Sequence, residues 1–189
     1  GGTWQGRSAG AGRATVTVEA RSTAPELTGT AQVEGDLRAN PNPPPEVATG
    51  GVLHAASFAR GFPLAPGSLV SIFGTRLAAG TTVATSLPLP PELGGTTAAI
   101  GGRVLPLLFT SPNQVNAMIP FDLTINAMHQ LLVRRGAALS VPEAVRVLAA
   151  QSGVFTKSAT GQGEGIVGRV APDGSQSVVG PDNPVQGGD

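Results

Sequence analysis

Several short segments of this chain alternate between apolar and polar residues with a period of two. In residues 13–20, Val16 and Val18 fall on one face, and threonines and a glutamate fall on the other; residues 69–73 and 114–119 show the same alternation. Successive side chains of a β-strand point to opposite sides of its sheet. The period therefore predicts strands that bury one face each.

Pro and Gly turns separate these segments from further short apolar runs. Gly101-Gly102 and Arg135-Gly136 are two-residue turn signals of the kind that close β-hairpins. The further strands that we expect cover residues 28–33, 52–58, 96–100, 104–110, 131–134 and 137–141. Together these runs predict an all-β chain with a β-sandwich architecture.

Residues 142–151 fit two kinds of element. Pro142 at a first helical position and Glu143 in the first turn favour a helix. Val145 and Val147, with Arg146 between them, favour a strand instead. We predict a strand, because the segment follows a predicted hairpin.

A Pro-rich segment, Asn40-Pro41-Asn42-Pro43-Pro44-Pro45, divides the chain. Such a run can form neither a helix nor a central strand and is typical of a semi-rigid spacer. We interpret residues 1–38 as the C-terminal fragment of an upstream β-sandwich repeat, since a lone hairpin is marginally stable. Residues 39–49 are then the linker, and residues 50–189 the main domain.

The amino-acid composition limits the kinds of binding and catalysis that this chain can perform. The chain is 40% apolar, which is enough for a packed core, while 27 Gly and 17 Pro fit frequent turns. Twelve basic and twelve acidic residues are scattered singly, so we expect neither nucleic acid binding nor membrane insertion. The absence of Cys excludes disulfides, cysteine zinc sites and thiol catalysis. We expect no cofactor.

Seven segments resemble one family. They are G-V-L-H-A-A-S-F (51–58), A-P-G-S-L-V-S-I-F-G-T (65–75), L-P-L-P-P-E-L-G-G-T (87–96), P-L-L-F-T-S-P-N-Q-V-N (106–116), G-V-F-T (153–156), G-Q-G (161–163) and D-N-P (182–184). In this order they resemble the uncharacterised C-terminal domain of many Solibacter-type acidobacterial proteins, an immunoglobulin-like module related to IPT/TIG domains. The family usually has Asn where His54 stands and Gly where Asn113 stands.

The resemblance implies an immunoglobulin-like, IPT/TIG-type β-sandwich over residues 50–189. The family continues past the D-N-P segment into a further strand, so this domain is expected to be incomplete at its C-terminus. Residues 13–37 resemble the closing strands of BACON-like or other immunoglobulin-like repeats. Both ends are therefore expected to be truncated, and no catalytic activity follows from the family.

Catalytic and metal sites are not expected. His54 and His129 are the only histidines, and no G-x-S-x-G motif accompanies them. His54 is predicted to end a strand or occupy a turn, with its imidazole bonded to backbone. The Gly161–Gly165 run lacks the Lys-Ser/Thr of a phosphate loop and is predicted to be a turn.

Oxygen ligands for calcium are the remaining metal candidate, at Asp173, Asp182, Asn183 and Asp189. Their spacing fits neither an EF-hand loop nor a nonapeptide calcium repeat. Asx-type turns are the simpler interpretation.

The candidate ligand-binding residues are aromatic. We predict that Phe58, Phe73, Phe109, Phe121 and Phe155 belong to the core, because each lies in an apolar context. Phe62, in the loop Arg60–Pro63, and Trp4 are predicted to be exposed. An exposed aromatic ring can stack on a sugar, so Phe62 and Trp4 are the candidate ligand-binding residues.

The sequence thus favours a non-enzymatic structural or adhesive module of a large exported, multi-domain bacterial protein, located outside the cell or on its surface. Its expected partners are neighbouring β-sandwich domains of the same polypeptide. The alternative is an accessory carbohydrate- or protein-binding module attached to an extracellular enzyme. A hydrolase is the third possibility, and the missing catalytic grouping speaks against it.

Overall fold

The computed structural model describes residues 12–23, 26–37 and 42–184, and every regular element in these residues is a β-strand. The prediction of an all-β chain is confirmed. The chain divides into two compact units, Gly1–Pro43 and Pro44–Asp189. Residues 44–49, which the sequence analysis placed in the linker, thus fall in the second unit.

The first unit contains one antiparallel ribbon. Its strands are β1 (Gly12–Thr23) and β2 (Glu26–Leu37), and Val18 lies opposite Ala31. The hairpin forms as expected, but Val18 and Val33 are 55% and 65% exposed. The predicted burial of one face is therefore absent among the described side chains of this unit, because a two-stranded ribbon has no second layer.

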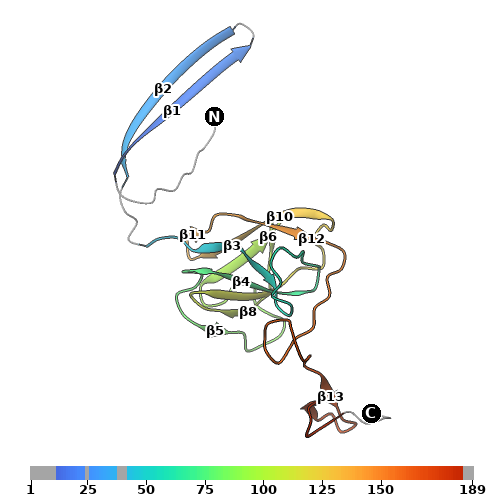
Figure 1. The fold of residues 1–189 in the computed structure, drawn as a ribbon. Helices are drawn as coiled ribbons and strands as arrows, with labels where there is room; N and C mark the ends of the chain where they lie inside the picture. Colours follow the sequence, from blue (N-terminus) through green and yellow to red (C-terminus); the bar gives the residue numbers. More distant parts are fainter. Residues whose placement is uncertain (1–11, 24–25, 38–41, 185–189) are drawn as a thin grey trace. The chain divides into compact units, whose positions relative to one another are not determined.

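The main body of the second unit consists of two five-stranded antiparallel sheets, drawn as two layers in Figure 1. The first sheet has the order β3 (Glu46–His54), β4 (Leu69–Thr75), β9 (Gln114–Met118), β8 (Leu107–Thr110), β5 (Thr82–Val83). The second sheet has β7 (Arg103–Val104), β6 (Thr96–Ile100) and β10 (Ala127–Arg135), followed by β12 (Glu143–Val147) and β11 (Ala138–Leu139) on the same edge of β10.

Aliphatic side chains from both sheets fill the space between them. Val70 and Ile72 of β4 are fully buried against residues such as Ile100 of β6 and Leu131 of β10. Leu69 and Phe73 lie on the opposite side of β4 and are half-buried. The alternation predicted for residues 69–73 is thus observed, and the unit is a β-sandwich with one shared core.

The predicted single strand at residues 104–110 is wrong. Val104 ends β7 in the second sheet, whereas Leu107 begins β8, which pairs with β9 and β5 in the first sheet. Pro106 separates the two strands and has no N–H to continue a ladder. Its carbonyl accepts a hydrogen bond from the Met118 N–H (3.0 Å), so the chain crosses between the sheets there.

Residues 143–147 form a strand, as predicted, and not a helix. Val145 and Val147 are buried in the core, while Arg146 between them is exposed. Burial of the two valines between the sheets outweighs the weak helix preference of the flanking residues.

Residues 148–184 lie outside both sheets. Their regular structure is a two-stranded hairpin, β13 (Gly168–Val170) and β14 (Gln176–Val178), which within the described residues pairs with neither sheet. This segment exposes six large apolar side chains: Val154, Phe155, Ile166, Val167, Val170 and Val178. The part from Val154 to Ile166 packs on the sandwich and forms a wall of the site described next.

Candidate functional site

Both histidine rings bond to backbone atoms. His54 ends β3, is 7% exposed, and accepts a hydrogen bond at Nδ1 from the Ala56 N–H (3.2 Å). Of the two positions predicted for His54, a strand end or a turn, the structure shows the strand end. The Nε2 of His129 lies 2.7 Å from the Thr124 carbonyl. Neither ring has a hydroxyl or carboxylate among its described hydrogen-bond partners.

His54 makes stability depend on pH. Burial lowers the pKa of His54 below its ordinary value of 6.5, since the charged ring is poorly solvated there. As the pH falls, His54 therefore binds a proton in the unfolded chain before it does so in the folded chain. The stability that neutral His54 contributes is complete above pH 6.5 and is lost as the pH falls through the lowered pKa of the folded state. We expect the urea concentration at the midpoint of unfolding to decrease when the pH is lowered from 7.5 to 5.

A His54→Asn variant is the control for this pH dependence. An Asn side chain does not titrate in this range, and its Oδ1 accepts the Ala56 N–H bond. The drop in urea midpoint between pH 7.5 and pH 5 should be smaller in the variant than in the wild type. An equal drop in both proteins would show that His54 is not responsible.

The acidic residues do not form a metal site in the part of the chain that the structure describes, which contains no group of three or more His, Cys, Asp or Glu side chains able to hold an ion. Asp173 Oδ1 accepts the Ser175 N–H (2.9 Å), which closes an Asx turn. Hydrogen bonds from Ser175 also lower the pKa of Asp173. Asn183 Nδ2 donates to Ser177 Oγ (3.1 Å), and Asp189 lies outside the described residues.

The prediction that five phenylalanines belong to the core is wrong. Phe121 and Phe155 are 76% and 48% exposed, and Phe58, Phe73 and Phe109 are half-buried outside the core cluster. An apolar neighbourhood in sequence does not indicate which face of a strand a ring occupies. Phe62 is exposed as predicted, at 58%, and Trp4 lies outside the described residues.

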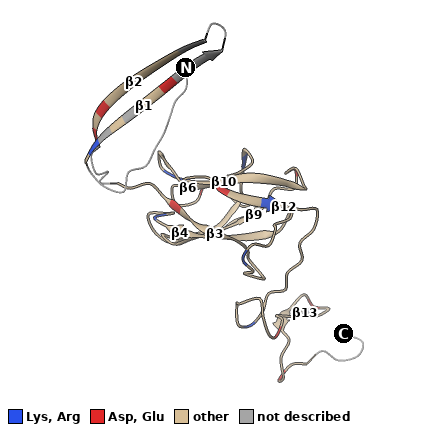
Figure 2. Ribbon diagram, turned by 45° about the horizontal axis from the view of Figure 1, so that its top comes forward, with Lys and Arg blue, Asp and Glu red and all other residues tan. Residues whose placement is uncertain are grey.

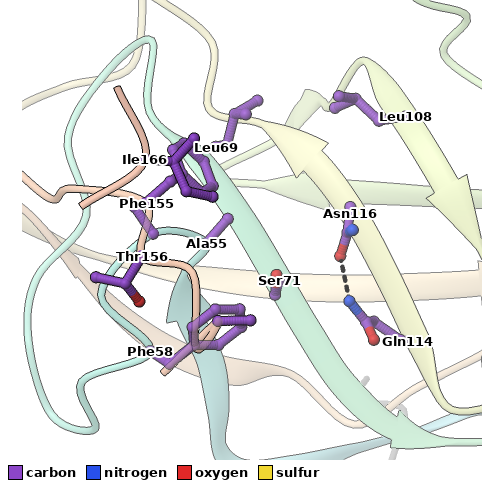
Figure 3. A pocket seen from close by; sticks show the side chains of 12 residues that line it. Ala55, Phe58, Leu69, Ser71, Leu108, Gln114, Asn116, Phe155, Thr156 and Ile166 are labelled. Carbon is purple, nitrogen blue, oxygen red and sulfur yellow. Dashed lines mark hydrogen bonds between the residues drawn. The ribbon is translucent and has the colours of Figure 1, made fainter. Parts of the chain in front are cut away.

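A cavity of about 280 Å³ lies on the outer face of the first sheet. Its floor consists of side chains that point away from the core: Leu69 and Ser71 of β4, Gln114 and Asn116 of β9, and Leu108 of β8. Gln114 Nε2 donates to Asn116 Oδ1 (2.7 Å), and Figure 3 shows this amide pair on one side of Ser71.

The opposite wall comes from distant parts of the chain. Phe58 follows β3, while Phe155, Thr156 and Ile166 belong to the segment from Val154 to Ile166. In Figure 3 the two phenylalanines lie across Ser71 from the amide pair. No motif in the sequence predicts this pocket, although three polar residues on the outer faces of the predicted strands, Ser71, Gln114 and Asn116, were a signal for it.

Backbone hydrogen bonds join the two ends of the outer wall to each other. The Ile166 N–H donates to the Phe155 carbonyl (2.6 Å), and the Lys157 N–H donates to the Glu164 carbonyl (2.9 Å). Gly161 has a left-handed φ of 76° and sits so close to the Ser57 backbone that a Cβ would overlap it. The turn predicted at Gly161–Gly165 thus lies directly against the sandwich at Ser57.

No protein-family model, no curated protein and no solved structure matches the chain. Among the described residues, no helix has the length and apolar character needed to cross a membrane.

Proposed function

We propose that residues 46–147 form an immunoglobulin-like sandwich that serves as a non-enzymatic structural or adhesive module. The observation that carries the proposal is the strand order. If the two-residue strands β5, β7 and β11 are set aside, the strands β3, β4, β6, β8, β9, β10 and β12 correspond in chain order to the positions A, B, C, D, E, F and G. The two sheets then read A-B-E-D and G-F-C, which is the arrangement of constant-type immunoglobulin domains.

The chemistry of the described surface is compatible with this role. Ion pairs such as Arg103–Asp122 (3.1 Å) and Arg134–Glu92 (3.5 Å) join exposed side chains of opposite sign. In Figure 2 the charged residues of the second unit are visible as single coloured positions along the ribbon. The resemblance to Solibacter-type C-terminal domains and the IPT/TIG class adds an exported, cell-surface setting with neighbouring sandwich domains as partners.

The complete reading frame around this coding segment tests the proposed role. A signal peptide and further sandwich repeats on either side would support a module of an exported stalk or adhesin. A catalytic domain beside this segment would favour the accessory module instead. A frame with neither an export signal nor repeats would contradict the structural role at the cell surface.

Limited proteolysis tests the division into two units. We expect cleavage between Asn40 and Pro45 to be faster than cleavage within Leu69–Phe73, because β4 is paired on both edges and buried on one face. Mass spectrometry of early digestion products measures both rates. Equal protection of the two segments would contradict the two-part organisation.

An accessory binding module is the second candidate, and the pocket on the first sheet favours it. Within that candidate, Phe62 and the pocket are separate surfaces, since Phe62 does not line the cavity. Loss of polysaccharide retention in a Phe62→Ala variant would assign the binding to the Arg60–Pro63 loop. The pocket requires its own experiment.

A further inference from the structure

We propose that the cavity between Phe58, Phe155 and the Gln114–Asn116 amide pair binds one uncharged sugar ring. The inference deepens the second candidate function, the accessory binding module, and does not depend on the structural role of the sandwich. Three properties of the cavity lead to it: its lack of charge, its division into a polar and an apolar side, and its size.

The lining of the cavity excludes a charged ligand. All twelve side chains that line it are uncharged. An ion brought into this site would lose water without meeting a group of opposite charge, which is unfavourable. The ligand is therefore neutral.

The polar side excludes a purely apolar ligand. The hydrogen bond from Gln114 Nε2 to Asn116 Oδ1 (2.7 Å) orients both amides and leaves an acceptor, Gln114 Oε1, beside a donor, Asn116 Nδ2. With the Ser71 hydroxyl, these groups need partners that both donate and accept. Covering them with hydrocarbon would cost about 1–3 kcal/mol for each unsatisfied group, whereas ligand hydroxyls satisfy them.

The apolar side suits the C–H face of a ring. Phe58 and Phe155 provide two aromatic surfaces, with Leu69 and Ile166 beside them. Phe58 is braced by Phe73, whose ring centroid lies 6.4 Å away at an interplanar angle of 47°. A pyranose has one apolar face and a rim of hydroxyls, and so it matches both sides of the cavity.

The size of the cavity limits the ligand to a single ring. Its volume of about 280 Å³ is slightly below the roughly 300–1,000 Å³ of typical small-molecule pockets. One terminal or monomeric sugar unit fits that space better than an extended chain does. The weak, millimolar range of affinity is expected for so small a ligand.

Nuclear magnetic resonance of the full ¹⁵N-labelled chain tests the proposal through the side-chain amide signals of Gln114 and Asn116. The probes are the methyl glycosides of glucose, galactose and mannose, and N-acetylglucosamine. Cyclohexanol serves as the apolar probe and glucuronate as the charged one. We expect saturable shifts of both amides with at least one neutral sugar, and weaker binding of cyclohexanol and glucuronate.

Variants locate the binding. Asn116→Ala should weaken the neutral sugar about tenfold, as expected for one lost hydrogen-bonding group in a part-buried site. Met128→Ala, in β10 of the second sheet and outside the cavity, should leave the affinity unchanged. The amide spectrum shows whether Asn116→Ala is folded. If it is not, Gln114→Ala is used instead, and sugar binding is followed by the side-chain amide signal of Asn116.

The proposal is overturned if none of the neutral sugars gives a saturable shift. It is also overturned if cyclohexanol binds as tightly as the sugars and Asn116→Ala has no effect, since the cavity would then be an apolar pocket. Neither result affects the structural role, which the reading frame decides separately.

Discussion

Replacing Ile72 by Ala is expected to lower the free energy of unfolding by about 2–5 kcal/mol. Ile72 is fully buried and lies between Val52 of β3 and Val115 of β9, which are buried with it. The truncation removes apolar contacts and leaves a cavity between two packed sheets, where neighbouring side chains relax only in part. Urea denaturation at pH 7.5 measures the loss.

The matched control for Ile72→Ala is Met128→Ala in β10. Met128 is 60% exposed, so its truncation should change the free energy of unfolding by no more than about 0.5 kcal/mol. Similar losses in the two variants would contradict the assignment of the core to the space between the sheets.

Replacing Gly161 by Ala is expected to detach the segment from Val154 to Ile166 while the sandwich remains folded. The new Cβ would overlap the backbone of Ser57, and neither backbone can move aside without separating the two. The left-handed φ of 76° adds a cost of about 1–2 kcal/mol for a residue other than Gly. Together these effects should open the outer wall of the pocket.

Hydrogen exchange measures this detachment. The amides of Lys157 and Ile166, which bond within the segment, should lose their protection, while the Ile72 and Val115 amides of the sheet keep theirs. The variant should also lose saturable sugar binding, because Phe155 and Ile166 move away.

Gly163→Ala separates the two causes. Gly163 has a similar left-handed φ of 89°, but a Cβ there meets only open space. This variant carries the conformational cost without the collision. Equal loss of protection in Gly161→Ala and Gly163→Ala would show that contact with Ser57 does not hold the segment.

The local pattern of residues was sufficient for most strands. The alternation in residues 69–73 and 114–119, and the strand at residues 143–147, were predicted because side-chain period and turn residues act over a few positions. The strand predicted at residues 104–110 was wrong because Pro106 marks a crossing between sheets. A single sequence does not show which sheet receives the next strand.

The candidate site was predicted less well. Phe62 is exposed as expected, but the cavity involves Phe58 and Phe155, which the apolar context had assigned to the core. Their surroundings depend on β4, β9 and a segment far along the chain. Contacts between segments that are far apart in the chain produce no periodic pattern of residues in the local sequence.

The residue pattern alone was enough to predict that this protein is all-β, that Pro and Gly turns separate many of its strands, and that His54 lies at a strand end or in a turn. These properties follow from backbone conformation and from alternation over neighbouring residues. The folded structure was needed to show which sheet each strand joins, that aliphatic rather than aromatic side chains fill the core, and that an uncharged pocket lies on the outer face of the first sheet. Packing between distant segments sets these features, because burial depends on what covers a side chain and not on its neighbours in sequence.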